Sequence, residues 1–169
     1  MASGASPGAP EATRALSSYV PRLVIDWLRD EPEAAHRAID GTLAFVDISG
    51  FTALTERLAR RGKAGAEEIS DVLNLVFEQL LAAAYDYGAG LVKWGGDAVL
   101  LLFDEEGHAA RACRAVMEMQ RTIRRVGKLR TSVGSVTLRM SVGVHSGTFD
   151  FFLVGDLHRA LRATTRGGC

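Results

Sequence analysis

Cysteine is scarce in this sequence, and neither sign of charge is in excess. The 169 residues contain two cysteines, Cys113 and Cys169, so neither a disulfide framework nor a cysteine-based metal site is expected. Twenty lysines and arginines balance twenty aspartates and glutamates, which argues against a whole-protein field that attracts nucleic acid or an anionic membrane. Any phosphate binding must therefore be local, and a reducing cytoplasm suits the cysteine content best.

Long apolar runs are missing as well. No uninterrupted apolar stretch reaches the roughly 18 residues that a membrane-spanning helix needs. Residues 1–16 are rich in Gly, Ser, Ala and Pro and lack the basic cluster and apolar core of a secretory signal, so they predict a disordered tail. Because 47% of the residues are hydrophobic, the rest of the chain is expected to form one compact domain. The lack of a long apolar stretch predicts that this domain does not enter a membrane.

The first half of the chain alternates between helical and extended patterns. Residues 17–40 predict a short amphipathic helix followed by a polar linker. The near-continuous apolar run from Thr42 to Ile48 predicts a buried strand. Two helices follow, one ending near Arg61 and one over residues 64–87. The Gly95-Gly96-Asp97 turn between two apolar runs then predicts a tight β-hairpin.

The second half predicts one helix and two strands. The helix spans residues 107–125, and its expected packed side carries Ala110, Cys113, Val116, Met117 and Gln120. The strands, 136–145 and 149–154, are expected to be joined by a hairpin at Ser146-Gly147. The element order β-α-α-β-β-α-β-β predicts an α+β fold, an α/β sandwich with helices packed on a mostly antiparallel sheet.

Two aspartates stand beside glycines at strand ends. Asp47 nearly closes the first strand, and Asp97 sits in the hairpin turn. If the hairpin lies beside the first strand, both carboxylates emerge at one end of the sheet, where oxygen ligands suit Mg²⁺ or Mn²⁺. The backbone N–H groups of Gly50, Phe51 and Thr52, at the start of the next helix, can face a triphosphate. The residues alone leave another interpretation open, in which Asp47 caps that helix and Asp97 is an ordinary turn acid.

Three motifs together resemble the catalytic domain of class III adenylate and guanylate cyclases. They are Phe45-Val-Asp-Ile-Ser-Gly-Phe-Thr, Lys93-Trp-Gly-Gly-Asp-Ala and Arg139-Met-Ser-Val-Gly-Val-His-Ser-Gly, in that order. The sequences of these motifs are similar to those of N-terminal cyclase domains of bacterial ATPase/LuxR-type regulators and of the soluble adenylate cyclase branch. The resemblance implies the ferredoxin-like sandwich of that family and a catalytic domain over residues 41–161.

The resemblance also implies a site and a reaction. Asp47, Asp97 and the carbonyl of Ile48 would hold two Mg²⁺ or Mn²⁺ ions, and Gly50, Phe51 and Thr52 would cradle the β- and γ-phosphates. Lys93 would read the purine and favour adenine. The expected reaction converts ATP to cyclic AMP and pyrophosphate in intracellular signalling. It is expected at the interface of a cytoplasmic homodimer that binds neither nucleic acid nor membrane.

The sequence departs from the family pattern near its end. The family carries an Asn and an Arg on a helix after the last strand, and those two positions fall on Arg159 and Ala163. A second purine-reading position falls near Phe152, which cannot accept a hydrogen bond. Residues 162–169 form an atypical tail, which indicates an incomplete domain. The alternative function is therefore a degenerate or truncated module that binds nucleotide or a partner without turnover.

Overall fold

A computed structural model describes residues 21–154 and 160–165 of the chain. The expected disordered tail, residues 1–16, lies outside these ranges. The described elements, in chain order, are α2 (Arg22–Asp30), β1 (His36–Ser49), α3 (Phe51–Ala59), α4 (Lys63–Tyr85), β2 (Gly90–Gly95), β3 (Ala98–Phe103), α5 (His108–Val126), β4 (Lys128–Thr131), β5 (Gly134–Thr137), β6 (Arg139–Val154) and β7 (Ala160–Thr165). No helix in the described ranges is long and apolar enough to span a membrane.

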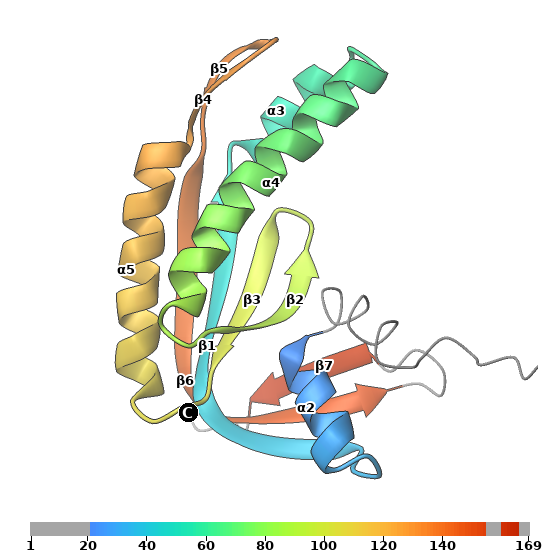
Figure 1. Cartoon of the computed structure of the whole chain (residues 1–169), viewed down its shortest axis with the longest axis vertical. Helices are drawn as coiled ribbons and strands as arrows, with labels where there is room; N and C mark the ends of the chain where they lie inside the picture. The colour runs from blue at the N-terminus through green and yellow to red at the C-terminus, as the bar shows by residue number, and fades with distance from the viewer. Residues whose placement is uncertain (1–20, 155–159, 166–169) are drawn as a thin grey trace, which may run out of the picture.

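The fold is a five-stranded sheet with helices on it, as the sequence predicts. The strand order is β2-β3-β1-β6-β7, and every strand pairing in the described residues is antiparallel. β4 and β5 form a separate hairpin that projects beyond the sheet near the tips of α3 and α4 (Figure 1). The predicted α+β class, with an antiparallel sheet under helices, is confirmed.

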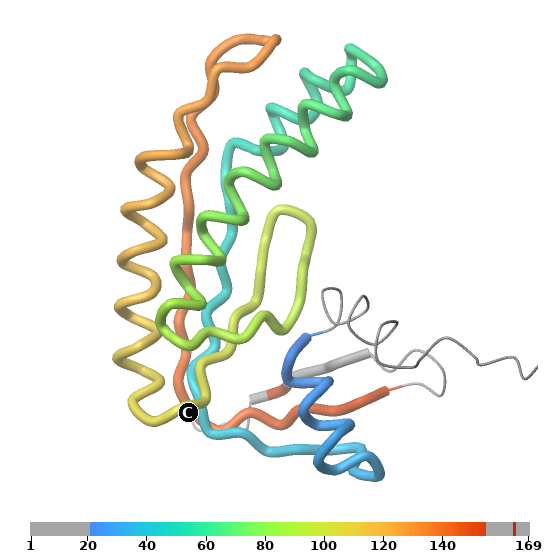
Figure 2. Tube along the Cα trace, viewed as in Figure 1, coloured from blue at the N-terminus to red at the C-terminus, as the bar shows by residue number. Residues whose placement is uncertain are grey.

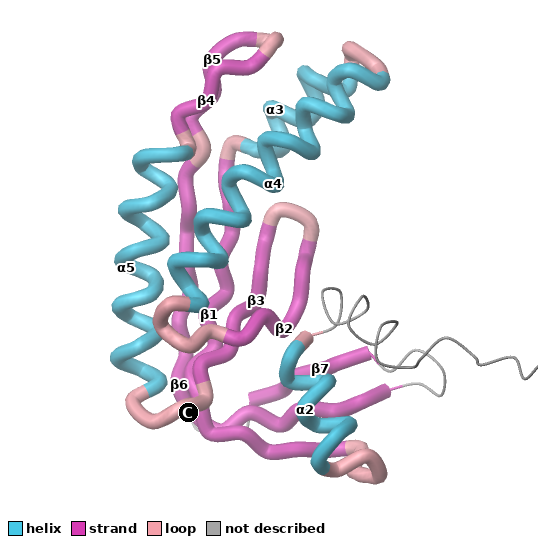
Figure 3. Tube along the Cα trace, in the orientation of Figure 1, coloured by secondary structure: helices cyan, strands magenta, loops and turns pink. Residues whose placement is uncertain are grey.

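The sheet has two hydrophobic cores, one on each face. Successive residues of β3 show this, because Leu101 and Phe103 pack in a core with α3, α4 and α5, whereas Leu102 packs with Trp27 of α2. Neighbouring strand residues point to opposite faces, so α2 covers the face that the other helices leave open. It covers only the lower end of that face (Figure 3), where Trp27 packs with Phe149 and Phe151 of β6.

β1 and β6 are long strands that bend together. They pair over their whole shared length, from His36↔Phe152 to Ser49↔Arg139, with Gly41 opposite Gly147. Both strands change direction together (Figure 2). The hairpin predicted at Ser146-Gly147 is therefore wrong. Gly147 has φ 158, which is nearly extended, so the chain bends there without reversing. Residues 36–40, expected in a linker, are the first part of β1.

The predicted packed side of α5 is also wrong. Cys113 is exposed, and so is Met117. The residues of α5 that the structure buries are Ala112, Ala115, Met119, Thr122 and Ile123. The predicted residues and the observed ones both follow the period of a helix. The observed buried side contains two alanines, whose small side chains allow α5 to pack closely against α4 and the sheet.

The end of the described chain is a strand where the sequence led us to expect a helix. β7 pairs with β6 from Val154↔Ala160 to Phe149↔Thr165, which covers backbone groups that would otherwise form an open sheet edge. Ala163 therefore lies in a strand, and Arg159 lies outside the described residues. The assignment of the family's Asn and Arg positions to Arg159 and Ala163 depended on a helix, so it does not apply to this strand. Residues 162–165 of the expected atypical tail belong to β7.

Candidate functional site

The fold brings Asp47 and Asp97 to the same end of the sheet. Asp47 pairs with Ala98, the residue next to Asp97, in the β1–β3 ladder. The backbone N–H of Ile48 donates a hydrogen bond of 3.1 Å to the carbonyl of Asp97. The β2–β3 hairpin thus lies beside β1, which is the condition on which the predicted convergence of the two aspartates depended.

The hairpin turn fixes where Asp97 leaves the sheet. Gly95 pairs with Ala98, so Gly96 and Asp97 form a two-residue loop. Gly96 has φ 73, while no described residue other than glycine has a positive φ. Two-residue hairpin loops require such a left-handed backbone at their first position. Gly96 therefore sets the geometry of the turn, and Asp97 is presented beside the end of β1.

Neither aspartate side chain has a structural role among the described residues. Both are half-buried, and neither carboxylate has a hydrogen bond or ion pair with a described residue. α3 begins at Gly50 without a side-chain cap, so the alternative in which Asp47 caps this helix is wrong. Both carboxylates are therefore available to a ligand.

The turn after β1 presents backbone N–H groups. Gly50 has φ 92, and a Cβ there would lie 3.1 Å from the carbonyl oxygen of Thr137. The position thus suits only glycine. Phe51 is buried in the core and anchors the turn, while Thr52 is exposed. The first turn of α3 has neither a side-chain cap nor an acidic residue, so its N–H groups are free to meet an anion.

Lys93 shares the uncovered face of the sheet with Asp47. Lys93 pairs with Leu100, and Leu100 pairs with Phe45, which is two residues before Asp47. Cross-strand partners and alternate residues of one strand share a face. Lys93 is exposed and has no polar partner among the described residues. Phe45 is 53% exposed and lies between buried Ala44 and Val46, so it is on the open face of the sheet.

The donor set at this end of the sheet fits hard divalent cations. Among the described residues, no group of three His, Cys, Asp or Glu side chains is arranged to hold a metal ion. Asp47 and Asp97 offer two carboxylates, and the third predicted ligand is the backbone carbonyl of Ile48. All three donors are oxygens, the type that Mg²⁺ and Mn²⁺ prefer. A two-carboxylate site keeps coordination positions for water or phosphate oxygens.

The structure does not bring Phe152 to this site. Phe152 lies on β6 beyond the bend, opposite His36 and with its ring 4.9 Å from that of His36. Lys93 is level with Phe45 and Gly143, on the other side of the bend. Phe152 is therefore not placed to contact a base that Lys93 reads, and its identity says nothing about base selection there.

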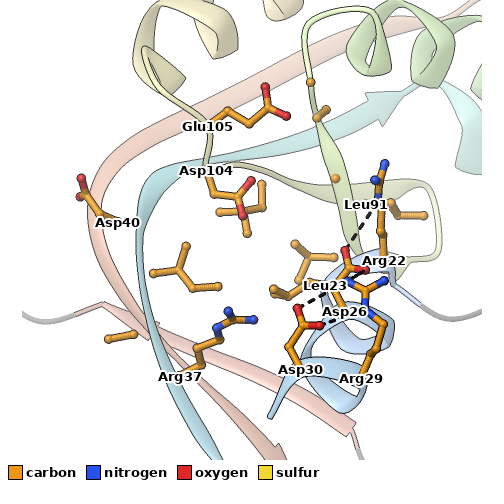
Figure 4. Close-up of a pocket in the computed structure, with 17 residues that line it drawn as sticks. Arg22, Leu23, Asp26, Arg29, Asp30, Arg37, Asp40, Leu91, Asp104 and Glu105 are labelled. Carbon is orange, nitrogen blue, oxygen red and sulfur yellow. Dashed lines mark hydrogen bonds and ion pairs between the residues drawn. The ribbon is translucent and has the colours of Figure 1, made fainter.

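A hollow of about 620 Å³ lies elsewhere, between α2 and the lower end of β1, β2 and β3 (Figure 4). Part of its charged lining is neutralised by ion pairs between lining residues. Asp26 pairs with Arg22 at 3.6 Å and with Arg29 at 2.9 Å, and Arg29 also pairs with Asp30 at 2.9 Å. Gly88 and Asp104, which also line it, lie at the end of the β2–β3 hairpin remote from Asp97. The hollow is separate from the aspartate site.

Comparison with known proteins identifies the family. Residues 34–160 match the family model of the adenylate and guanylate cyclase catalytic domain. Adenylate cyclase type 10 of Mus musculus is 27% identical over 146 residues, which cover 83% of this chain but 9% of that protein. The chain therefore spans a small part of the curated relatives that it matches.

Solved structures show the same fold. A bacterial light-regulated adenylyl cyclase superposes with a TM-score of 0.72 at 20% identity, covering 93% of this chain and 45% of that one. A dimeric guanylyl cyclase domain of the fungus Blastocladiella emersonii gives 0.59 at 22% identity, with 76% and 69% covered. With the match over residues 34–160, the chain belongs to the adenylate and guanylate cyclase catalytic domain family.

Proposed function

We propose that the chain is a catalytic domain that converts ATP to cyclic AMP and pyrophosphate with two divalent metal ions. The observation that carries the proposal is the convergence of Asp47 and Asp97, whose carboxylates have no partner among the described residues, beside an uncapped helix start. The reaction forms a bond between the ribose 3′-oxygen and the α-phosphorus, breaks the bond from that phosphorus to the bridging oxygen, and releases the 3′-hydroxyl proton to solvent. Phosphoryl transfer of this kind depends on positioning and charge neutralisation.

Each part of the site has a distinct task in this proposal. Asp47, Asp97 and the carbonyl of Ile48 would hold Mg²⁺ or Mn²⁺, which when bound lowers the pKa of the attacking hydroxyl and neutralises the leaving pyrophosphate. The N–H groups of Gly50, Phe51 and Thr52 bind the β- and γ-phosphate oxygens. Because the turn is rigid at Gly50, these donors are in position before the substrate arrives.

The proposed active form is a homodimer. Phe45, an exposed aromatic residue, lies on the same sheet face as Asp47 and Lys93. A second copy placed on this face would bury Phe45 and set its own Lys93 opposite the Asp47 of the first copy. Lys93 can donate to N1 of adenine, whereas N1 of guanine carries a proton and cannot accept, which favours ATP over GTP in this proposal. Each active site is then built from residues of both chains.

An assay of product formation tests the proposal. The purified chain is incubated with ATP and Mn²⁺, and cyclic AMP is quantified by mass spectrometry for the native chain and for Asp47→Ala and Asp97→Ala. Asp86→Ala is the matched control, because Asp86 is exposed and follows α4 near the start of β2, remote from the Asp97 turn. We expect turnover that both site variants reduce at least about a hundredfold and that the control leaves unchanged.

Two other outcomes would contradict the proposed reaction. If ATP binds in a metal-dependent manner but no cyclic AMP forms, the chain acts as a nucleotide-binding module. If GTP is converted faster than ATP, the reaction class stands and the assignment of Lys93 to adenine is wrong. Parallel incubations with GTP and with a non-hydrolysable ATP analogue distinguish these cases.

A further inference from the structure

A second hollow lies at the outer side of β6, one strand away from Asp47, because Met140 in its lining pairs with Ile48 of β1. It measures about 570 Å³ and is lined by residues of α5, by Lys128 and by the stretch that leads from β5 into β6. α5 runs alongside β6 here (Figure 2). Sites for small organic ligands have volumes of about 300–1,000 Å³, so the hollow is large enough for one.

The rim of this hollow carries three cationic side chains. Arg124, Lys128 and Arg139 line it, and no acidic residue does. All three are exposed, and none has a hydrogen bond or ion pair from its side chain to another described residue. The hollow between α2 and the sheet differs in this respect, because its arginines are paired. Like charges gathered without counter-ions repel one another, and an anion would relieve that repulsion.

The surrounding segment has few acidic residues that could neutralise these positive charges. From Gly107 to Phe149 the sequence has eight lysines and arginines but a single acid, Glu118. Glu118 is already engaged, by Arg121 at 3.1 Å. The zero net charge of the whole chain therefore hides a strongly basic segment. Complementarity here points to a negatively charged ligand.

A purely structural role accounts for one of the three cations. Arg124 lies in the last turn of α5, where a positive charge stabilises the helix dipole. Lys128 and Arg139 are outside the helix, so this explanation does not extend to them. Stabilisation of α5 also does not explain why all three surround one hollow.

The floor of the hollow is apolar. Ile123 and Leu138 are 5% and 3% exposed, and Met140 is half-buried. From these observations we propose that the hollow binds a small organic anion, whose apolar body rests on Ile123, Leu138 and Met140. Its sulfonate, carboxylate or phosphate group contacts Arg124, Lys128 and Arg139. Such a site is independent of the proposed cyclase reaction and would be present even if the chain turned over no nucleotide.

The methionines allow a local test by NMR of the full chain with carbon-13 methyl labels. Met140 lies in the hollow, Met117 is exposed on α5 outside its lining, and Met119 is fully buried. The probe is naphthalenesulfonate, and naphthalenemethanol is its uncharged counterpart. We expect naphthalenesulfonate to shift the Met140 methyl signal saturably and to leave Met117 in place. The Met119 signal reports that every variant is folded.

Charge variants complete the experiment. Arg124→Gln and Lys128→Gln should each weaken naphthalenesulfonate binding about tenfold. Arg114→Gln should leave it within twofold, because Arg114 is an exposed arginine of the same helix that does not line the hollow. The proposal is overturned if Met140 does not respond, if the uncharged probe binds equally well, or if Arg114→Gln weakens binding as much as Arg124→Gln does.

Discussion

The N–H of Ile48 hydrogen-bonds to the carbonyl of Asp97 across 3.1 Å. This contact ties the end of β1 to the β2–β3 turn and keeps the main chains of Asp47 and Asp97 adjacent without using either carboxylate. Both carboxylates therefore remain available to a cation, which is the physical basis of the proposed metal site.

Substitution of Gly50 should destabilise the fold more than substitution of a matched glycine. Gly50→Ala combines a left-handed backbone, φ 92, with a Cβ 3.1 Å from the carbonyl of Thr137. Gly107, with φ 73, also begins a helix, but a Cβ there meets nothing within 4 Å. We expect losses of about 2–3 kcal/mol for Gly50→Ala and about 1 kcal/mol for Gly107→Ala in urea unfolding. Equal losses would show that the approach of Thr137 is unimportant.

Thr42 is the buried centre of a hydrogen-bond chain that leads to the surface. It is 0% exposed, and its hydroxyl lies 2.7 Å from His108 Nδ1 and 2.7 Å from the hydroxyl of Ser146. Thr42→Val keeps the shape but leaves both partners without this hydroxyl, so we expect a loss of about 1–3 kcal/mol in the free energy of unfolding. Thr42→Ser, which keeps the hydroxyl, should cost less than Thr42→Val in the same measurement. The reverse order would rule out the hydrogen bonds as the main contribution.

The projecting β4–β5 hairpin should loosen in acid. Glu68 of α4 accepts hydrogen bonds from the backbone N–H of Ser132, at 2.8 Å, and from its hydroxyl. These bonds lower the pKa of Glu68 below its ordinary value of 4.5. The contact is therefore complete above the ordinary value and is lost as the pH falls through the lower, folded-state pKa. The amide NMR signal of Ser132 should follow this titration, and Glu68→Gln should abolish it. A signal that is insensitive to pH across this range would contradict the role of Glu68.

The convergence of the two aspartates was predictable because its signals are local. Gly95 and Gly96 precede Asp97 and indicate a hairpin turn, and Asp47 lies near the end of a buried apolar run. Pairing of the hairpin with the first strand brings the two aspartates to one end of the sheet. The only tertiary contact that had to be assumed is that these two elements are neighbours. The exposure of Phe45 required knowing that α2 covers only one end of the open face, which the sequence does not reveal.

The errors in the predicted fold arise where local patterns are ambiguous. Ser146-Gly147 has a typical turn composition, but continuous pairing of β6 with β1 holds Gly147 nearly extended. The β4–β5 hairpin around Gly134 was missed because its strands are four residues long and mostly polar or exposed. The strand β7 was mistaken for a helix because the edge of β6, a tertiary feature, decides its conformation.

The open sheet face predicts a specific effect on assembly. Phe45→Glu places a charge on the surface proposed to meet a second copy, and it should convert the dimer to a monomer in sedimentation velocity experiments. Phe45 is already 53% exposed, so we expect the stability of the fold to change by less than about 0.5 kcal/mol. Met117→Glu is the control, because Met117 is 57% exposed on α5. Dimers that persist in Phe45→Glu would place the interface elsewhere.

Complementation between two inactive variants tests the central claim most directly. Asp47→Ala and Lys93→Ala are purified separately, mixed in equal amounts and assayed for cyclic AMP formation from ATP. If one site takes Asp47 from one copy and Lys93 from the other, half of the dimers after random exchange carry one intact site, and about one quarter of native activity should return. A mixture as inactive as its components would contradict the shared metal and nucleotide site at the dimer interface.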